Sequence, residues 1–303
     1  MNHDVMTALV LIGAMTLASQ SLARLSGLPA ILFLLASGVP LVPTTGLIAV
    51  DAVFGDLLFP FVSLGVAAIL FEGSLTLKLR QIAGHGAVVR NLVTFGPFIT
   101  WAIVTLITYT FIGVSWPLAL LFGSIMTVTG PTVIVPMLQS VRPNRDVANI
   151  LRWEGILIDP IGAILAVLTF NFIVAQQLGS VGLDLAWQLL RLALAGLFIG
   201  ALAGQLWGTA LRRYWIQHDL QSVATLLMVF IVFWAADSIE HESGLLAVTV
   251  MGIWLANMRD VHVDEILDFK DRLSILLISG LFIILAARLE FQQLRDVGWP
   301  ALI

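Results

Sequence analysis

Residues 152–160 read RWEGILIDP and open an apolar run that continues to residue 174. A run of this length can cross the hydrocarbon core of a bilayer as an α-helix, which takes about 20 residues. Asp159 lies well inside the run, where an ionisable side chain is costly and tends to serve function. The stretch therefore predicts a transmembrane helix that carries a functional carboxylate.

The composition is that of a membrane protein throughout. Of the 303 residues, 59% are hydrophobic and 11% are charged, and the mean hydropathy is +1.00. One soluble core cannot bury so much apolar surface, so the bilayer must serve as the solvent. The net charge of −4 gives no basic footprint for nucleic acid, and the lack of cysteine excludes thiol catalysis and thiolate metal sites.

Ten apolar segments follow one another with short polar connections, which leaves no room for a sizeable soluble domain. The sequence therefore predicts an all-α polytopic membrane protein with about ten transmembrane helices. The first segment is expected to be a retained helix, because no Lys or Arg precedes it. The predicted spans are 5–23, 28–42, 55–75, 88–111, 116–138, 152–174, 184–210, 220–238, 243–258 and 272–289.

Basic residues alternate along the connections. Positively charged loops tend to stay in the cytoplasm. Of the 15 basic residues, Arg191, Arg288 and Arg295 fall at one set of alternate boundaries and all others at the opposite set, so the N-terminus is predicted outside. The basic residues predicted inside are Arg24, Lys78, Arg80, Arg90, Arg142, Arg145, Arg152, Arg212, Arg213, Arg259, Lys270 and Arg272.

Asp159 is the strongest candidate for chemistry, since it lies about one and a half turns into the sixth predicted span. Glu154 precedes it by five residues, which is about 140° around a helix and about 7.5 Å along it, so the two carboxylates need not share one site. Alternatively, Asp159 makes a packing hydrogen bond or pairs with an arginine, and Glu154 forms an ion pair with Arg152.

The sequence TVTGPT at residues 127–132 predicts a break in the fifth span. Pro131 lacks an N–H and clashes with the preceding turn, and Gly130 has no side chain to resist unwinding. A broken span exposes carbonyl groups that can bind ions. A packing kink that binds nothing is the alternative interpretation.

Two weaker features complete the set. Glu72 lies near the end of the third span, in the sequence FEGSL. A salt bridge to Lys78 or Arg80, or snorkelling of its side chain to the cytoplasmic interface, explains a carboxylate at this position. Residues 241–247, HESGLLA, form an outer turn before the ninth span. No spaced histidine cluster, phosphate loop or nucleophile elbow is present, and an enzyme would need a second group at the depth of Asp159.

The order of these features resembles the bacterial sodium/proton antiporters of the NhaP type, in the monovalent cation:proton antiporter family. The resemblance rests on FEG at 71–73, TGP at 129–131, Glu154 followed by Asp159, and SGLLA at 243–247, and it covers nearly the whole chain. It implies a homodimeric inverted-repeat transporter of about a dozen helices in the bacterial cytoplasmic membrane, with a dimerisation domain and a moving core. No cofactor is implied, and lipid, protons and Na⁺ or K⁺ are the expected partners.

The resemblance also assigns residues to the ion site. In the family, the glutamate at the position of Glu154 pairs with an arginine on a later helix. That arginine and a second broken helix would lie beyond residue 303, and Arg288 does not replace the arginine. Residues 296–303, DVGWPALI, read as the start of a further span, so the C-terminal helices are expected to be missing and residues 1–303 to be one incomplete transmembrane domain. The implied residues are Asp159 and Thr129 for cation or proton binding, and Glu154, Glu72, Gly130 and Pro131 for lining or structural ion pairing.

Three positions depart from the family pattern. Gly130 stands where aspartate is common, Ile158 where asparagine is common and Gly155 where serine is usual. The site thereby loses two side-chain oxygen donors and one carboxylate, which leaves the choice of Na⁺ or K⁺ open and favours electroneutral exchange. Two other hypotheses remain, namely a ligand-gated potassium efflux system and a sensor of ions or pH that does not transport.

Overall fold

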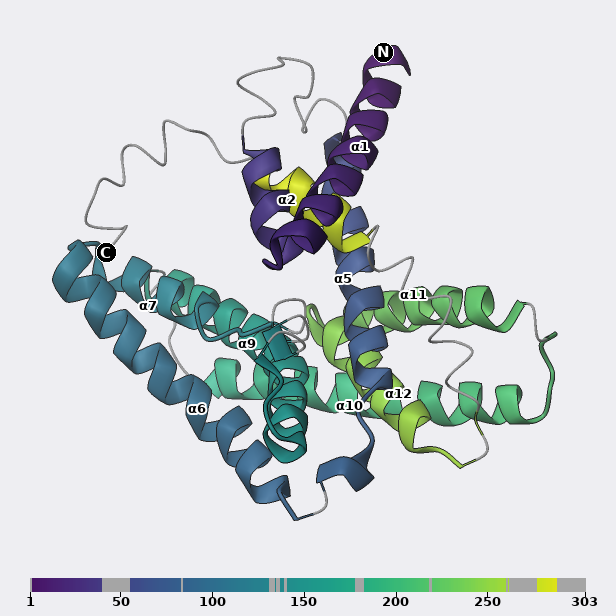
Figure 1. Ribbon diagram of the computed structural model, residues 1–303. Coiled ribbons are helices and arrows are strands. Elements are labelled where there is room, and N and C mark those ends of the chain that lie inside the picture. The colour runs from purple at the N-terminus through teal and green to yellow at the C-terminus, as the bar shows by residue number, and fades with distance from the viewer. Residues whose placement is uncertain are drawn as a thin grey trace. The chain divides into compact units, whose positions relative to one another are not determined.

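The computed structural model describes residues 2–39, 55–82, 84–130, 134, 137–138, 141–177, 183–217, 220–259, 261 and 277–287. The regular elements within these ranges are helices (Figure 1). The chain divides into two compact units, one formed by Met1–Val66 with Lys270–Ile303 and the other by Ala67–Phe269.

The first unit brings helices near the start of the chain and a helix over residues 277–287 around one apolar core. Its elements are α1 (Asn2–Ser26), α2 (Ala30–Gly38), the 3-10 turn η1 (Gly55–Leu57), the first half of α5 (Leu58–Leu75) and a helix over residues 277–287. Gly38 lets the last of these approach closely, since an added Cβ would lie 2.7 Å from the carbonyl oxygen of Ile283. The buried core residues are Ile12, Leu34, Leu58, Ile283, Ile284 and Ala287.

The second unit contains the elements that the sequence associates with function. Its core includes Leu77, Trp153 and Ile156, all buried. Within it α9 contacts α6, α7, α10 and α12. The elements are the second half of α5, η2 (Leu79–Ile82), α6 (Gly86–Ile107) with a π-helical end η3 (Thr108–Ile112), α7 (Trp116–Ile125), α9 (Arg145–Gln177), α10 (Leu183–Arg212), α11 (Gln221–Ile239) and α12 (Ser243–Asn257).

Glycines allow α10 and α12 to pack at short distance. Gly196, Gly200, Gly204 and Gly208 recur every four residues and so share one face of α10. A Cβ added at Gly196 would lie 2.8 Å from the Cβ of Leu246, and one at Gly204 would lie 2.8 Å from the Cβ of Trp254. Larger side chains on this face would force the two helices apart.

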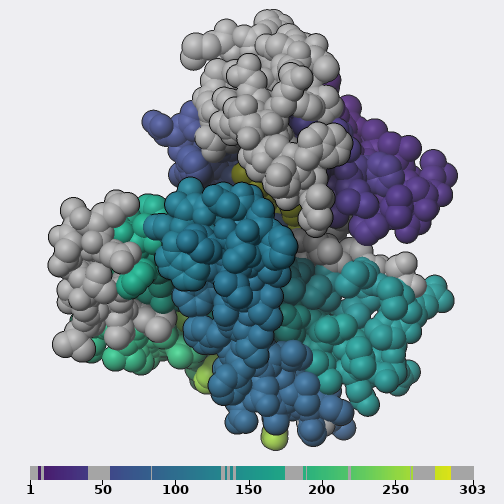
Figure 2. Space-filling view, turned by 90° about the vertical axis from the view of Figure 1, so that its left-hand side faces the viewer, coloured from purple at the N-terminus to yellow at the C-terminus, as the bar shows by residue number. Residues whose placement is uncertain are grey.

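The surface of α6 is suited to lipid. Phe95, Phe98, Ile99, Ile103 and Leu106 are exposed on it, and Figure 2 shows the blue side chains of α6 and α7 across the near face. Soluble monomers rarely expose apolar patches of this kind. Among the described residues, the helices long and apolar enough to cross a membrane are Gly55–Leu75, Gly86–Ile112, Arg145–Val174, Leu190–Arg212 and Gln221–Ile239. The prediction of a multi-pass, all-helical membrane protein is confirmed.

Predicted and observed boundaries agree for most spans. The sixth span begins seven residues before its predicted start, because Asn144 accepts a hydrogen bond from the Val147 N–H at 2.8 Å and so caps the start of α9. The fifth span, predicted over 116–138, is not one helix, since α7 ends at Ile125. The count of ten spans, the inverted repeat and the outside N-terminus stay predictions.

Candidate functional site

The fifth span is interrupted close to the predicted break. α7 ends at Ile125, and the chain is not α-helical from Met126 to Gly130. The Ser124 and Thr127 hydroxyls donate to the carbonyls of Leu121 and Ser124, both at 2.7 Å, and so compete with continued helix. The helix therefore stops before Gly130, and Pro131 lies outside the described residues.

Gly130 takes a backbone conformation that favours glycine. Its φ is +37°, which a residue with a Cβ adopts less readily. Its carbonyl accepts a hydrogen bond from the Ile134 N–H at 3.3 Å. The glycine found where the family commonly has aspartate thus has a local structural reason.

One face of α9 brings Asp159 against this interrupted segment. Gly155, Asp159 and Gly162 are spaced by four and three residues, so they share that face. A Cβ at Gly155 would lie 2.8 Å from Ile134 Cδ1, and one at Gly162 would lie 3.3 Å from Thr127 Oγ1. Asp159 is half-buried and lies between the two glycines on the helix face that they share.

Thr129 and Glu154 meet across the same boundary. The Thr129 hydroxyl donates to Glu154 Oε1 at 2.9 Å, although the two residues are 25 positions apart. Glu154 is half-buried and Thr129 is exposed. Within the described part of the chain, Glu154 forms no salt bridge with Arg152, which was one alternative for this carboxylate.

Glu72 lies in the last turn of α5, between two residues that contact neighbouring helices. A Cβ added at Gly73 would lie 3.5 Å from Ile156 Cγ1 of α9, and one at Gly252 of α12 would lie 2.8 Å from the carbonyl oxygen of Phe71. Glu72 itself is half-buried. The end of α5 thus lies against the stretch of α9 that carries Glu154 and Asp159.

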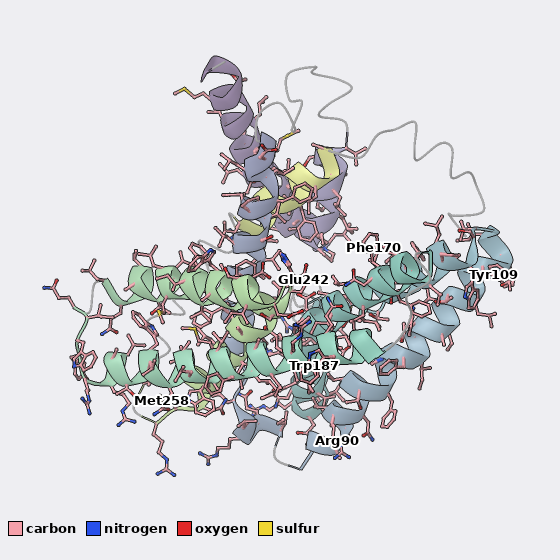
Figure 3. All side chains as sticks on the ribbon, turned by 180° about the vertical axis from the view of Figure 1, so that it is seen from behind. Arg90, Tyr109, Phe170, Trp187, Glu242 and Met258 are labelled. Atoms are coloured by element: carbon pink, nitrogen blue, oxygen red, sulfur yellow. The ribbon has the colours of Figure 1, made fainter. Side chains whose placement is uncertain are left out.

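The HESGLLA motif closes the turn between α11 and α12. The Glu242 N–H donates to Asp237 Oδ1 at 2.7 Å, and the buried Ser243 hydroxyl donates to the Ala236 carbonyl at 2.7 Å. Glu242 has a φ of +70° directly before α12, and Glu242 and Met258 flank the two ends of that helix (Figure 3). This motif is turn chemistry rather than part of the ion site.

The electrostatics of this turn are nonetheless unusual. Burial raises the pKa of Glu242 above its ordinary value, the negative charge of Asp237 raises it further, and His241 lowers it in part. His241 Nδ1 lies 3.7 Å from Asp237 Oδ2, and Arg191 Nε lies 3.6 Å from Glu240 Oε2. Several charged side chains therefore gather at this turn.

Sequence reasoning missed two residues that shape the site. Gly162 leaves room for the residues that follow α7, and Asn257 bonds to the backbone after α5. Gly162 could have been found from its spacing to Asp159, whereas Asn257 depends on tertiary contact alone. The described residues hold no group of three or more His, Asp or Glu side chains that could bind a metal ion.

Known proteins share this fold and sequence pattern. The chain is 24% identical over 262 residues to "Probable Na(+)/H(+) antiporter 2" of Methanocaldococcus jannaschii, which covers 81% of this chain and 60% of that protein. It is 27% identical over 249 residues to "K(+)/H(+) antiporter NhaP" of Alkalimonas amylolytica, covering 79% of this chain and 42% of that protein. This chain therefore spans between 42% and 60% of the length of these two relatives.

The fold is similar to that of the sodium proton antiporter MjNhaP1 from Methanocaldococcus jannaschii. The TM-score is 0.81 at 23% sequence identity, and the match covers 97% of this chain and 73% of that one. The sequence pattern described as the transmembrane region of sodium/hydrogen exchangers matches residues 8–303. The chain therefore belongs to the sodium/hydrogen exchanger family.

Proposed function

We propose that the protein is a secondary antiporter that exchanges Na⁺ or K⁺ for protons across a bacterial cytoplasmic membrane. The observation that carries the proposal is Asp159, a carboxylate on the face of α9 that packs against the interrupted fifth span. Interrupted membrane helices supply unpaired backbone groups where ions bind in transporters. Both kinds of antiporter named among the relatives fit this chemistry.

Exchange follows from the two states of one carboxylate. Ionised Asp159 binds a monovalent cation, and neutral Asp159 holds a proton, so the two ions compete for the same group. A conformational change that carries the occupied site across the membrane then moves one cation in one direction and one proton in the other. One carboxylate supports an electroneutral exchange.

Thr129 completes the site through its oxygen. Its hydroxyl hydrogen points to Glu154, which leaves the oxygen lone pairs free to face a cation. The two positions of α9 that differ from the family pattern supply no further oxygen. Ile158 is apolar and 2% exposed, and Ile134 fills the space beside Gly155. Backbone carbonyls of residues 126–130 and water would complete the ligand shell of Na⁺ or K⁺.

The finer features expected of the family belong to the same proposal. They are a homodimer, an inverted repeat, about ten spans in this chain, basic loops in the cytoplasm and an N-terminus outside. The alternation of basic residues supports the orientation. The exposed apolar surface of α6 supports contact with lipid.

Inside-out vesicles from cells that express the complete gene test the proposal. A pH-sensitive dye reports loss of the pH gradient when Na⁺ or K⁺ is added, and the ion that responds is the substrate. Asp159→Asn should abolish the response. Asp146→Asn, which neutralises an exposed carboxylate in the first turn of the same helix, should leave it unchanged. Normal exchange by Asp159→Asn at equal abundance would end the proposal.

A further inference from the structure

One side chain, Asn257, joins the end of α12 to the backbone after α5. The Leu79 N–H donates to Asn257 Oδ1 at 2.7 Å, and Asn257 Nδ2 donates to the Leu77 carbonyl at 2.9 Å. Asn257 Nδ2 also donates to the Ile253 carbonyl at 2.7 Å within α12. The side-chain amide therefore uses its oxygen and both of its N–H groups.

The backbone at this point cannot pair its own polar groups. α5 ends at Leu75, and the N–H groups of Thr76 and Leu77 still bond to the carbonyls of the last turn, at 3.0 Å each. The Leu77 carbonyl lies between that turn and η2, and the Leu79 N–H belongs to the first residue of η2, where a helix supplies no partner for its own N–H. Asn257 pairs both groups, the Leu77 carbonyl at a half-buried position and the Leu79 N–H at an exposed one.

The segment held by Asn257 carries a core residue of the site. Leu77 is fully buried and packs in one cluster with Trp153 and Ile156 of α9. Ile156 lies between Glu154 and Asp159 in sequence. Fixing Leu77 therefore fixes the end of α5 against the stretch of α9 that carries both carboxylates.

We propose that Asn257 is a positioning residue for the ion site. Through Leu77 and Leu79 it sets the end of α5, and with it Glu72, in register with α9, without touching the ion. This inference rests on the proposed antiport at Asp159. Loss of the Asn257 hydrogen bonds lets the end of α5 move away from α9 and weakens cation binding.

The position of the end of α5 can be measured without any transport assay. Residues 1–303 contain no cysteine, so Ser74→Cys introduces the one thiol of this region, which differs from the hydroxyl by one atom. The same protein without Ser74→Cys gives the background labelling to be subtracted. Ser74 is 0% exposed and lies against Gly252 of α12, so a membrane-permeant maleimide should label it slowly. Adding Asn257→Ala should speed labelling about threefold or more, because the end of α5 opens more often.

A matched control removes another hydrogen bond of α12. Trp254 Nε1 donates to Gln205 Oε1 of α10 at 3.1 Å, away from α5. Gln205→Ala should leave the labelling rate of the cysteine unchanged. Equal labelling in Asn257→Ala and in the parent, or equal acceleration by both substitutions, would overturn the positioning role.

Transport kinetics then separate positioning from simple loss of protein. In vesicles, Asn257→Ala should raise the apparent KM for the cation about three- to tenfold, on the scale of one lost hydrogen-bonded contact, while the maximal rate per folded protein changes little. Asn257→Gln keeps the amide and should recover part of the affinity. Asn257→Asp loses the donor to the Leu77 carbonyl and should not recover any affinity. If Asn257→Ala does not accumulate, Asn257→Asp takes its place in the test.

The outcomes distinguish this inference from the proposed function. If the parent protein exchanges no cation, the antiport proposal fails, and the labelling comparison still decides whether Asn257 holds the end of α5. If the parent exchanges cations and Asn257→Ala keeps the KM of the parent, the positioning role fails alone.

Discussion

Replacing Gly252 by alanine tests how closely α12 must approach α5. An added Cβ would overlap Ser74 Oγ and would lie 2.8 Å from the Phe71 carbonyl oxygen and 3.0 Å from Ser74 Cβ. The Ser74 hydroxyl can rotate away, but only by breaking its hydrogen bond to the Phe71 carbonyl at 2.7 Å. The carbonyl itself belongs to the helix backbone, so the two helices must separate.

The magnitude follows from opposing contributions. Overpacking against a backbone costs about 1–3 kcal/mol, and loss of the Ser74 hydrogen bond costs about 1 kcal/mol. Alanine in place of glycine inside a helix stabilises it by about 1 kcal/mol. We expect Gly252→Ala to destabilise the protein by a net amount of about 1–3 kcal/mol.

Gly13 of α1 provides the matched control, since nothing lies within 4 Å of a Cβ added there and no proline directly follows it. Gly13→Ala should raise stability by about 0.5–1 kcal/mol through helix propensity alone. Heating the purified variants in detergent should give a midpoint for Gly252→Ala lower than the parent by roughly 2–6 °C, at about 2 °C per kcal/mol. A midpoint for Gly252→Ala as high as that of Gly13→Ala would refute the close approach of α5 and α12.

Two further predictions concern the turn before α12 and the choice of ion. Burial and the charge of Asp237 raise the pKa of Glu242 above its ordinary value of 4.5, with His241 opposing in part, so the folded protein binds this proton more tightly than the unfolded chain. Glu242 therefore contributes stability that is present at acid pH and lost as pH rises from 4.5 through its raised pKa. Over that pH interval, the thermal midpoint of Glu242→Gln should fall less than that of the parent. An identical pH slope in parent and variant would contradict this. Gly155→Ser adds a hydroxyl to the ion site, and the terminal methyl of Ile134, 2.8 Å from the new Cβ, must rotate away. The variant should lower the KM for Na⁺ relative to that for K⁺ about fivefold, because one polar contact is worth about 1 kcal/mol. An unchanged ratio of the two KM values would contradict it.

The helices could be predicted because the bilayer sets their length. A run such as 184–210 must be helical to satisfy its backbone in lipid, and α10 spans Leu183–Arg212. The break in the fifth span was also predictable from Gly130 and Pro131. The early end of α7 was not, because the Ser124 and Thr127 hydroxyls can either bond to the preceding turn of an intact helix or end it.

The site could be predicted in its residues but not in its contacts. Asp159 and Glu154 stand out because carboxylates are rare at membrane depth. The bond from Thr129 to Glu154 joins residues 25 positions apart, so no helical spacing indicates it. The role of Asn257 gives no sequence signal, because its two partners after α5 are 178 and 180 residues away and are backbone groups that every residue carries.

Glycines on α9 and α10 serve two different purposes through the same geometry. On α10, a Cβ added at Gly200 would overlap the backbone carbonyl of Ala247, so the two helices pack through backbone at this point. These two helices must therefore move together, because their contact involves backbone that cannot re-pack. On α9, Gly155 and Gly162 instead meet side chains, those of Ile134 and Val128, which can change rotamer. A conformational change that opens the ion site is therefore expected beside Asp159 rather than between α10 and α12.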